Sequence, residues 1–132
     1  MIGVDTNILV RYVLDDDPVW SPIATRFIES DLTPEAPGYI NPVTLAELAW
    51  ALRRHQNYDR ARLATVIEGL LTYDRIVIGE ADAVFRALAA FRQGGAGFAD
   101  YLIAELNAAA GARPTMTIDR KAAARPLFSP LS

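Results

Sequence analysis

The chain contains no cysteine and a single histidine among its 132 residues. The absence of cysteine excludes disulfide bonds, thiolate nucleophiles and cysteine-ligated zinc sites. The one histidine, His55, cannot build a multi-histidine metal site, and it follows Arg53 and Arg54 in a polar run typical of a solvated helix end. Any chemistry that this protein performs is therefore expected to depend on carboxylates.

Long hydrophobic runs are also missing. No apolar stretch approaches the roughly 20 residues of a membrane-spanning helix, and the N-terminus lacks the basic region and apolar stretch of a secretory signal. With 52% hydrophobic and 22% charged residues, the composition is that of a globular protein. We therefore expect a soluble, cytoplasmic protein that makes no membrane contact, and the length favours one domain spanning residues 1–132.

Acidic residues outnumber basic ones, with 16 aspartates and glutamates against 13 lysines and arginines. The net charge is −3 and the pI about 5.1, which argues against a protein that binds nucleic-acid phosphates through its overall charge. Every basic residue except Lys121 is an arginine, the planar side chain suited to phosphate contacts. The charge balance still permits an enzyme that reaches phosphates through bound cations, because clustered acids attract divalent ions.

Hydrophobic periodicity predicts strands alternating with helices. The expected strands are residues 2–4, 38–40, 75–79 and 115–118, and the expected helices are residues 8–14, 19–30, 42–54, 58–73, 80–91 and 98–110, with a short helix from residue 120 and a proline-containing tail. The expected core includes Trp20, Phe27, Leu45, Leu48, Ala49 and Leu52. This order of elements is typical of an α/β fold with a parallel sheet covered on both faces.

Acids stand at the ends of these elements. Asp5 and Asp119 end strands, at the carboxyl edge where α/β sheets gather ligands. Glu47 and Asp100 are placed in the first turns of helices that follow from that edge. Structural explanations stay open for two of the acids. Asp5 is also an ordinary helix N-cap, and exposure or a salt bridge to Arg54 explains Glu47 as well as a functional role does. Oxygen ligands of this kind suit Mg²⁺ or Mn²⁺, and such ions support hydrolysis of phosphodiesters by activated water.

Four segments around these acids resemble the successive motifs of the PIN-domain ribonucleases. They are VDTNILV (4–10), LAELAW (45–50), FADYLIA (98–104) and TIDRKA (117–122). Over essentially its whole length, the chain is similar to the VapC-type toxins of bacterial type II toxin–antitoxin pairs. The resemblance implies a PIN-like three-layer sandwich, in which a short parallel sheet of about four to five strands is flanked by helices on both faces.

The resemblance also implies an endoribonuclease that depends on Mg²⁺ or Mn²⁺. Its catalytic residues and metal ligands would be Asp5, Glu47, Asp100 and Asp119. Thr6 and Asn7 would orient Asp5 and a metal-bound water. Gly97 stands where such toxins often carry a further acid, so no further carboxylate is expected.

Partners follow from the same resemblance: an RNA substrate, a second copy of the chain in a homodimer, and a cognate VapB-type antitoxin that covers the active-site groove. The basic residues nearest the acids in sequence are candidates for contacts to RNA phosphates. They are Arg11, Arg54, Arg120 and Lys121.

The alternatives are a phosphotransferase, a receiver domain and a binding module. A haloacid-dehalogenase-like phosphotransferase would require an aspartate at the position of Asn7, and a phosphate-accepting receiver domain would require a late lysine placed differently from Lys121. A catalytically silent PIN-fold binding module is the non-enzymatic alternative. The presence of all four acids argues against a silent site.

Overall fold

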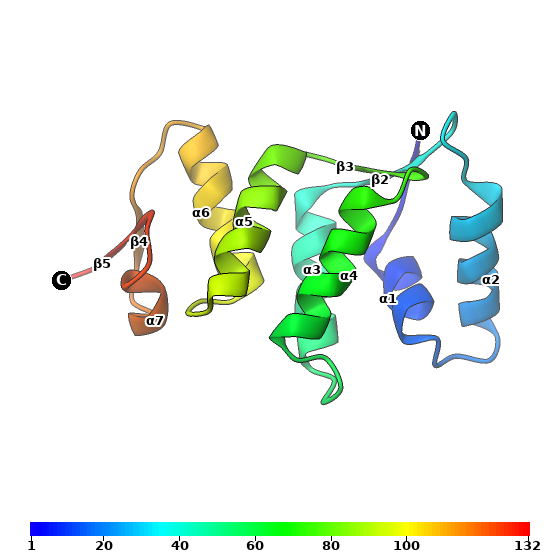
Figure 1. Cartoon of the computed structure of the whole chain (residues 1–132), viewed down its shortest axis with the longest axis horizontal. Helices are drawn as coiled ribbons and strands as arrows, with labels where there is room; N and C mark the ends of the chain where they lie inside the picture. The colour runs from blue at the N-terminus through cyan, green and yellow to red at the C-terminus, as the bar shows by residue number, and fades with distance from the viewer. The chain divides into compact units, whose positions relative to one another are not determined.

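The structure is a computed structural model that describes all residues from 1 to 132 (Figure 1). The chain forms two compact units, Met1–Gly79 and Glu80–Ser132. Each unit contains parallel strands and several helices, so the predicted α/β class is confirmed. No helix is long and apolar enough to span a membrane.

The strands of the first unit are β1 (Ile2–Gly3), β2 (Gly38–Ile40) and β3 (Ile76–Ile78), which form a parallel sheet in the order β1-β2-β3. The Val4 N–H continues the pairing by donating to the Tyr39 carbonyl at 2.9 Å. Because β1 and β2 are parallel, the residues that follow them lie at the same edge of the sheet. Asp5 and Asn41 occupy these two positions.

The helices of the first unit are α1 (Thr6–Leu14), α2 (Trp20–Arg26), the π-helix η1 (Phe27–Asp31), α3 (Pro42–Arg53) and α4 (Arg60–Thr72). Helix α1 packs against α2 and α3, and α4 packs against α3 and β3 (Figure 1). The fully buried side chains are Leu9, Ile28, Leu32, Ile40, Leu45, Leu48, Leu52, Leu63 and Ile67. The leucine stripe predicted for α3 is therefore confirmed.

The expectation that Trp20 belongs to the core was wrong, because 61% of its surface is exposed. Helix α2 and η1 are apolar on two faces. One face, which includes Ala24 and Ile28, is buried, while Trp20 and Phe27 lie on the other. Phe27 is half-buried and, like Trp20, lines a surface cavity. Periodicity alone does not distinguish these two faces.

The strands of the second unit are β4 (Thr115–Thr117) and β5 (Phe128–Pro130), which pair in parallel. Its helices are α5 (Ala81–Gln93), α6 (Phe98–Ala109) and the short α7 (Arg120–Ala123) between the two strands. Helices α5 and α6 pack side by side, with Phe91 and Phe98 in edge-to-face contact at 6.0 Å between ring centres.

The strands differ from the prediction in two respects. Residues 128–130 were expected to belong to a tail, yet they form a short strand that pairs with β4, and Pro130, which lacks an N–H, stands at its end. The five strands are also divided between a three-stranded and a two-stranded sheet, whereas one sheet was expected. Element order predicts parallel pairing but not which strands share a sheet.

Asp17 fixes the turn between α1 and α2. Its Oδ1 accepts the N–H groups of Trp20 at 2.8 Å and Val19 at 2.9 Å. These two hydrogen bonds lower the pKa of Asp17 below its usual value, because they stabilise the ionised carboxylate. The turn that begins α2 is therefore stabilised by hydrogen bonds to the ionised carboxylate of Asp17.

Replacing Asp17 by alanine removes this acceptor, and we expect a lower midpoint of thermal unfolding at pH 7. Because folding lowers the pKa of Asp17, its stabilising effect is fully present above the unfolded pKa of about 3.9. The effect is lost as the pH falls through the still lower folded-state pKa. Thermal melts followed by circular dichroism should therefore show the difference between the two proteins shrinking below about pH 4.

The control is Asp17→Asn, which keeps a side-chain oxygen without the charge. Its midpoint at pH 7 should stay closer to that of the unmodified protein than the midpoint of the alanine variant, with a weaker dependence on pH. An alanine variant as stable as the unmodified protein at pH 7 would contradict the role given to Asp17.

Candidate active site

Asp5 lies between β1 and α1, in extended backbone conformation. Its Oδ1 accepts the N–H of Thr6, the first helical residue, at 2.8 Å. A usual N-cap serves the second or third helical residue instead, so Asp5 is an incomplete cap. The carboxylate is exposed, and its second oxygen makes no hydrogen bond within the protein.

Glu47 lies in the second turn of α3, one turn beyond the predicted place. Asn41 fixes the start of this helix, since its side chain accepts the N–H of Thr44 at 2.9 Å. The Thr6 hydroxyl donates to Glu47 Oε1 at 2.8 Å. No ion pair joins Glu47 to Arg54, so the salt bridge considered from the sequence does not form.

Thr6 therefore links two of the predicted site residues. Its N–H binds Asp5 and its hydroxyl binds Glu47, although Thr6 and Glu47 are 41 residues apart in the sequence. The structure thus brings the two acids of the first unit together. Thr6 was expected to orient Asp5, and its bond to Glu47 is an additional contact that the sequence did not indicate.

Asp100 lies in the first turn of α6, as predicted. Its Oδ2 accepts the N–H of Gly97 at 3.2 Å. The glycine-rich segment before α6 is held by Tyr101, whose hydroxyl donates to the Gly94 carbonyl and accepts the Ala96 N–H. The loop and α6 together fix the half-buried Asp100 side chain.

Asp119 follows β4 and is a complete N-cap of α7. Its Oδ1 accepts the N–H groups of Lys121 at 2.8 Å and Ala122 at 3.1 Å. The Asp119 N–H in turn donates to the Thr117 hydroxyl at 3.0 Å. Thr117, Asn41 and Tyr101 are positioning residues that the sequence analysis missed. Asn41 was detectable, because an N-cap residue followed by proline is a helix-start signal.

The four acids share one electrostatic property. None of them forms an ion pair with an arginine or lysine. Each uses one carboxylate oxygen in the hydrogen bonds above, and the other oxygen has no protein partner. Within neither unit do three such side chains gather into a metal-binding group. The first unit thus supplies one linked pair, and the second supplies Asp100 and Asp119 without a hydrogen bond between them.

The four basic candidates differ in their surroundings. Arg11 is paired with Asp16 at 2.9 Å, so its charge is partly neutralised. Arg54, at the end of α3, and Arg120 and Lys121, at the start of α7, are exposed. These three have no ion-pair partner within the protein.

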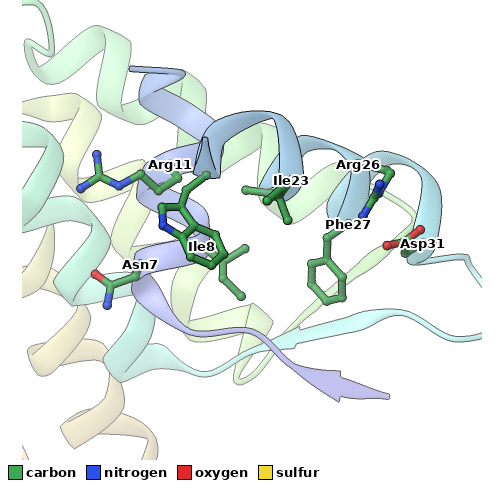
Figure 2. A pocket seen from close by; sticks show the side chains of 9 residues that line it. Asn7, Ile8, Arg11, Ile23, Arg26, Phe27 and Asp31 are labelled. Carbon is green, nitrogen blue, oxygen red and sulfur yellow. The ribbon is translucent and has the colours of Figure 1, made fainter. Parts of the chain in front are cut away.

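A cavity of about 490 Å³ lies between α1 and α2 beside Asn7. Figure 2 shows Ile8, Ile23 and Phe27 along its middle. Asn7 and Arg11 lie at one end, and Arg26 and Asp31 lie at the other. Asn7 makes no hydrogen bond to Asp5, so the orienting role expected for it stays a prediction.

The chain matches the family model described as the PIN domain over residues 2–125. Comparisons with curated proteins and with solved structures found no match. The family match extends over both compact units and includes all four acids, and organisation as a single domain stays a prediction. PIN domains are generally nucleases, which supports a nuclease role. The PIN-like α/β fold is thereby confirmed, and the chain belongs to the PIN domain family.

Proposed function

We propose that this protein is a metal-dependent endoribonuclease and acts as a VapC-type toxin. The observation that carries the proposal is the state of the four acids in a PIN-domain chain. Asp5, Glu47, Asp100 and Asp119 all lack a basic partner, and each has a carboxylate oxygen free of hydrogen bonds within the protein. Unpaired carboxylates in a nuclease family are the groups expected to bind cations.

The donor chemistry fits Mg²⁺ or Mn²⁺. The available ligands are carboxylate oxygens, while soft thiolate ligands are absent and histidine is limited to His55. The proposed ligands are Asp5 and Glu47 in the first unit and Asp100 and Asp119 in the second. When bound, such an ion supplies an activated water and stabilises charge on the phosphate during phosphodiester hydrolysis. PIN-domain nucleases typically use divalent metals, which supports this assignment.

The chain's own residues orient the acids. Thr6 restrains Asp5 and Glu47 together, so that neither carboxylate needs to be ordered when a cation binds. Main-chain N–H groups restrain Asp100 and Asp119 in the same way. Preorganised ligands lower the entropy that binding would otherwise cost.

RNA and protein partners belong to the same proposal. The exposed Arg54, Arg120 and Lys121 are suited to phosphate contacts, whereas Arg11 must first leave Asp16. A toxin of this class acts as a homodimer and is silenced by a VapB-type antitoxin. The apolar cavity beside Asn7 supports a partner segment that inserts apolar side chains there.

Asp5→Asn and Asp100→Asn should each reduce RNA cleavage by at least about 100-fold, because each change removes a charged ligand and keeps the side-chain shape. Cleavage of total RNA by the purified variants is the measurement, together with relief of growth inhibition on expression. Circular dichroism should show an intact fold.

The control for these variants is Glu35→Gln, which neutralises an exposed loop acid outside the four motifs. Its cleavage rate should equal that of the unmodified protein. Full cleavage by Asp5→Asn and Asp100→Asn would remove the assignment.

Thr6→Val keeps the shape of the side chain but cannot donate to Glu47. We expect cleavage to fall about tenfold, since a hydrogen bond to a charged group is worth roughly 1.5 kcal/mol. Affinity for Mn²⁺, measured by calorimetry, should fall with it. Thr6→Ser restores the hydroxyl and should recover both values. Equal activity of the valine and serine variants would show that the bond to Glu47 has no role.

Chelation should silence the enzyme. Dialysis against EDTA removes divalent ions, and cleavage should return when Mg²⁺ or Mn²⁺ is added, because the oxygen ligands favour these hard cations. The readout is the initial rate of cleavage against the concentration of added metal. A rate that is unaffected by EDTA would contradict the metal mechanism.

A further inference from the structure

Helix α3 carries a tryptophan that points away from the core. Trp50 is 65% exposed, while its neighbours Leu48, Ala49 and Leu52 are buried. Trp20 is exposed to a similar extent, at 61%, so exposure alone does not mark a binding site. What distinguishes Trp50 is the chemistry of the residues beside it.

The exposed face of α3 carries an acidic, an aromatic and a basic side chain in a row. Glu47, Trp50 and Arg54 are separated by three and four residues, so they lie on one side of the helix. The row spans about 10 Å along the axis, at 1.5 Å per residue. An indole thus stands between a carboxylate of the proposed active site and a guanidinium.

The surface around Trp50 is hollowed and positively charged. Trp50, Arg53 and Arg54 line a cavity of about 370 Å³, and no acid is among its lining residues. Arg53 donates to the Tyr58 carbonyl at 2.9 Å, which fixes its side chain. The Arg54 side chain has no hydrogen-bond or ion-pair partner within the protein, so its charge is available.

We propose that this hollow binds one nucleotide of the RNA substrate in single-stranded form. The base stacks on the Trp50 indole, Arg54 binds the adjacent phosphate, and the strand continues along α3 toward Glu47. Stacking requires an unpaired base, because the faces of bases in a duplex are already covered. The inference rests on the proposed function, since it assigns a subsite to the same nuclease.

A protein partner is the other macromolecule that could cover an exposed indole. The observations favour RNA, because both other lining residues are arginines and the hollow has no acid to balance them. A guanidinium can bind a phosphate while the aromatic ring beside it stacks on the base of the same nucleotide. An apolar protein surface would leave the free charge of Arg54 without a partner.

Intrinsic fluorescence tests the stacking directly, because Trp20 and Trp50 are the only tryptophans. In Trp20→Phe, Trp50 is the sole indole, and titration with a single-stranded oligoribonucleotide in EDTA should quench it without cleavage. In Trp50→Phe, the remaining Trp20 should respond weakly. Duplex RNA of the same length should quench Trp50 several times less.

Anisotropy of a labelled single-stranded RNA then measures affinity. Trp50→Ala should weaken binding at least about tenfold, whereas Trp50→Tyr keeps an aromatic face and should retain most of the affinity. Arg54→Gln should weaken binding and lower the salt dependence by about one phosphate contact. Val19→Ala, which changes another strongly exposed apolar residue of the first unit, should have no effect.

Unchanged RNA affinity in Trp50→Ala, with an intact fold by circular dichroism, would overturn the inference. Quenching of Trp20 but not Trp50 would also overturn it. Loss of a dimer in Trp50→Ala without loss of RNA affinity would assign this face to a second copy of the chain. The proposed function is tested separately by RNA cleavage. If the protein cleaves no RNA but RNA still quenches Trp50, the nuclease assignment is wrong and the RNA-binding subsite stands.

Discussion

A threonine between two carboxylates is the contact on which the candidate site depends. Thr6 donates its N–H to Asp5 and its hydroxyl to Glu47. Both bonds require α1 and α3 to begin at neighbouring points, and the parallel pairing of β1 with β2 places Asp5 and Asn41 there. The pairing of β1 with β2 therefore sets the distance between the starts of α1 and α3. A different strand register would move Glu47 away from Thr6.

The charges of the site oppose its stability. Two carboxylates joined through one threonine repel each other, and no arginine or lysine is paired with either. Asp17 and Asp119 are alike in one respect: in each, Oδ1 accepts two N–H groups at the start of a helix, and the other oxygen has no protein partner. Hydrogen bonding alone therefore does not distinguish a structural acid from a candidate functional one. The candidate acids are distinguished by their places in the PIN-like sequence motifs, and Asp5 and Glu47 also by the threonine that links them.

Local patterns predicted most elements, and long-range contacts account for what they missed. The change from an apolar strand to a polar helix start at Asp5 is visible in sequence, as are the leucine stripe of α3 and the start of α6. Trp20 was misplaced because α2 and η1 are apolar on two faces, and only the packing of α1 decides which one is buried. Strand β5 was missed because its three residues pair with β4 across an intervening helix. The bond between Thr6 and Glu47 joins residues that are far apart in sequence, so no spacing rule predicts it.

The net charge of −3 constrains how the proposed nuclease binds its substrate. A negative protein does not attract RNA from a distance, so affinity has to come from short-range contacts. Exposed arginines and an exposed indole supply such contacts locally, as on the outer face of α3. The unpaired acids meanwhile repel a phosphate until a divalent cation reverses the local charge. Cation binding should therefore precede productive RNA binding at the acids, whereas stacking on Trp50 needs no cation, and the two contributions to affinity are physically separable.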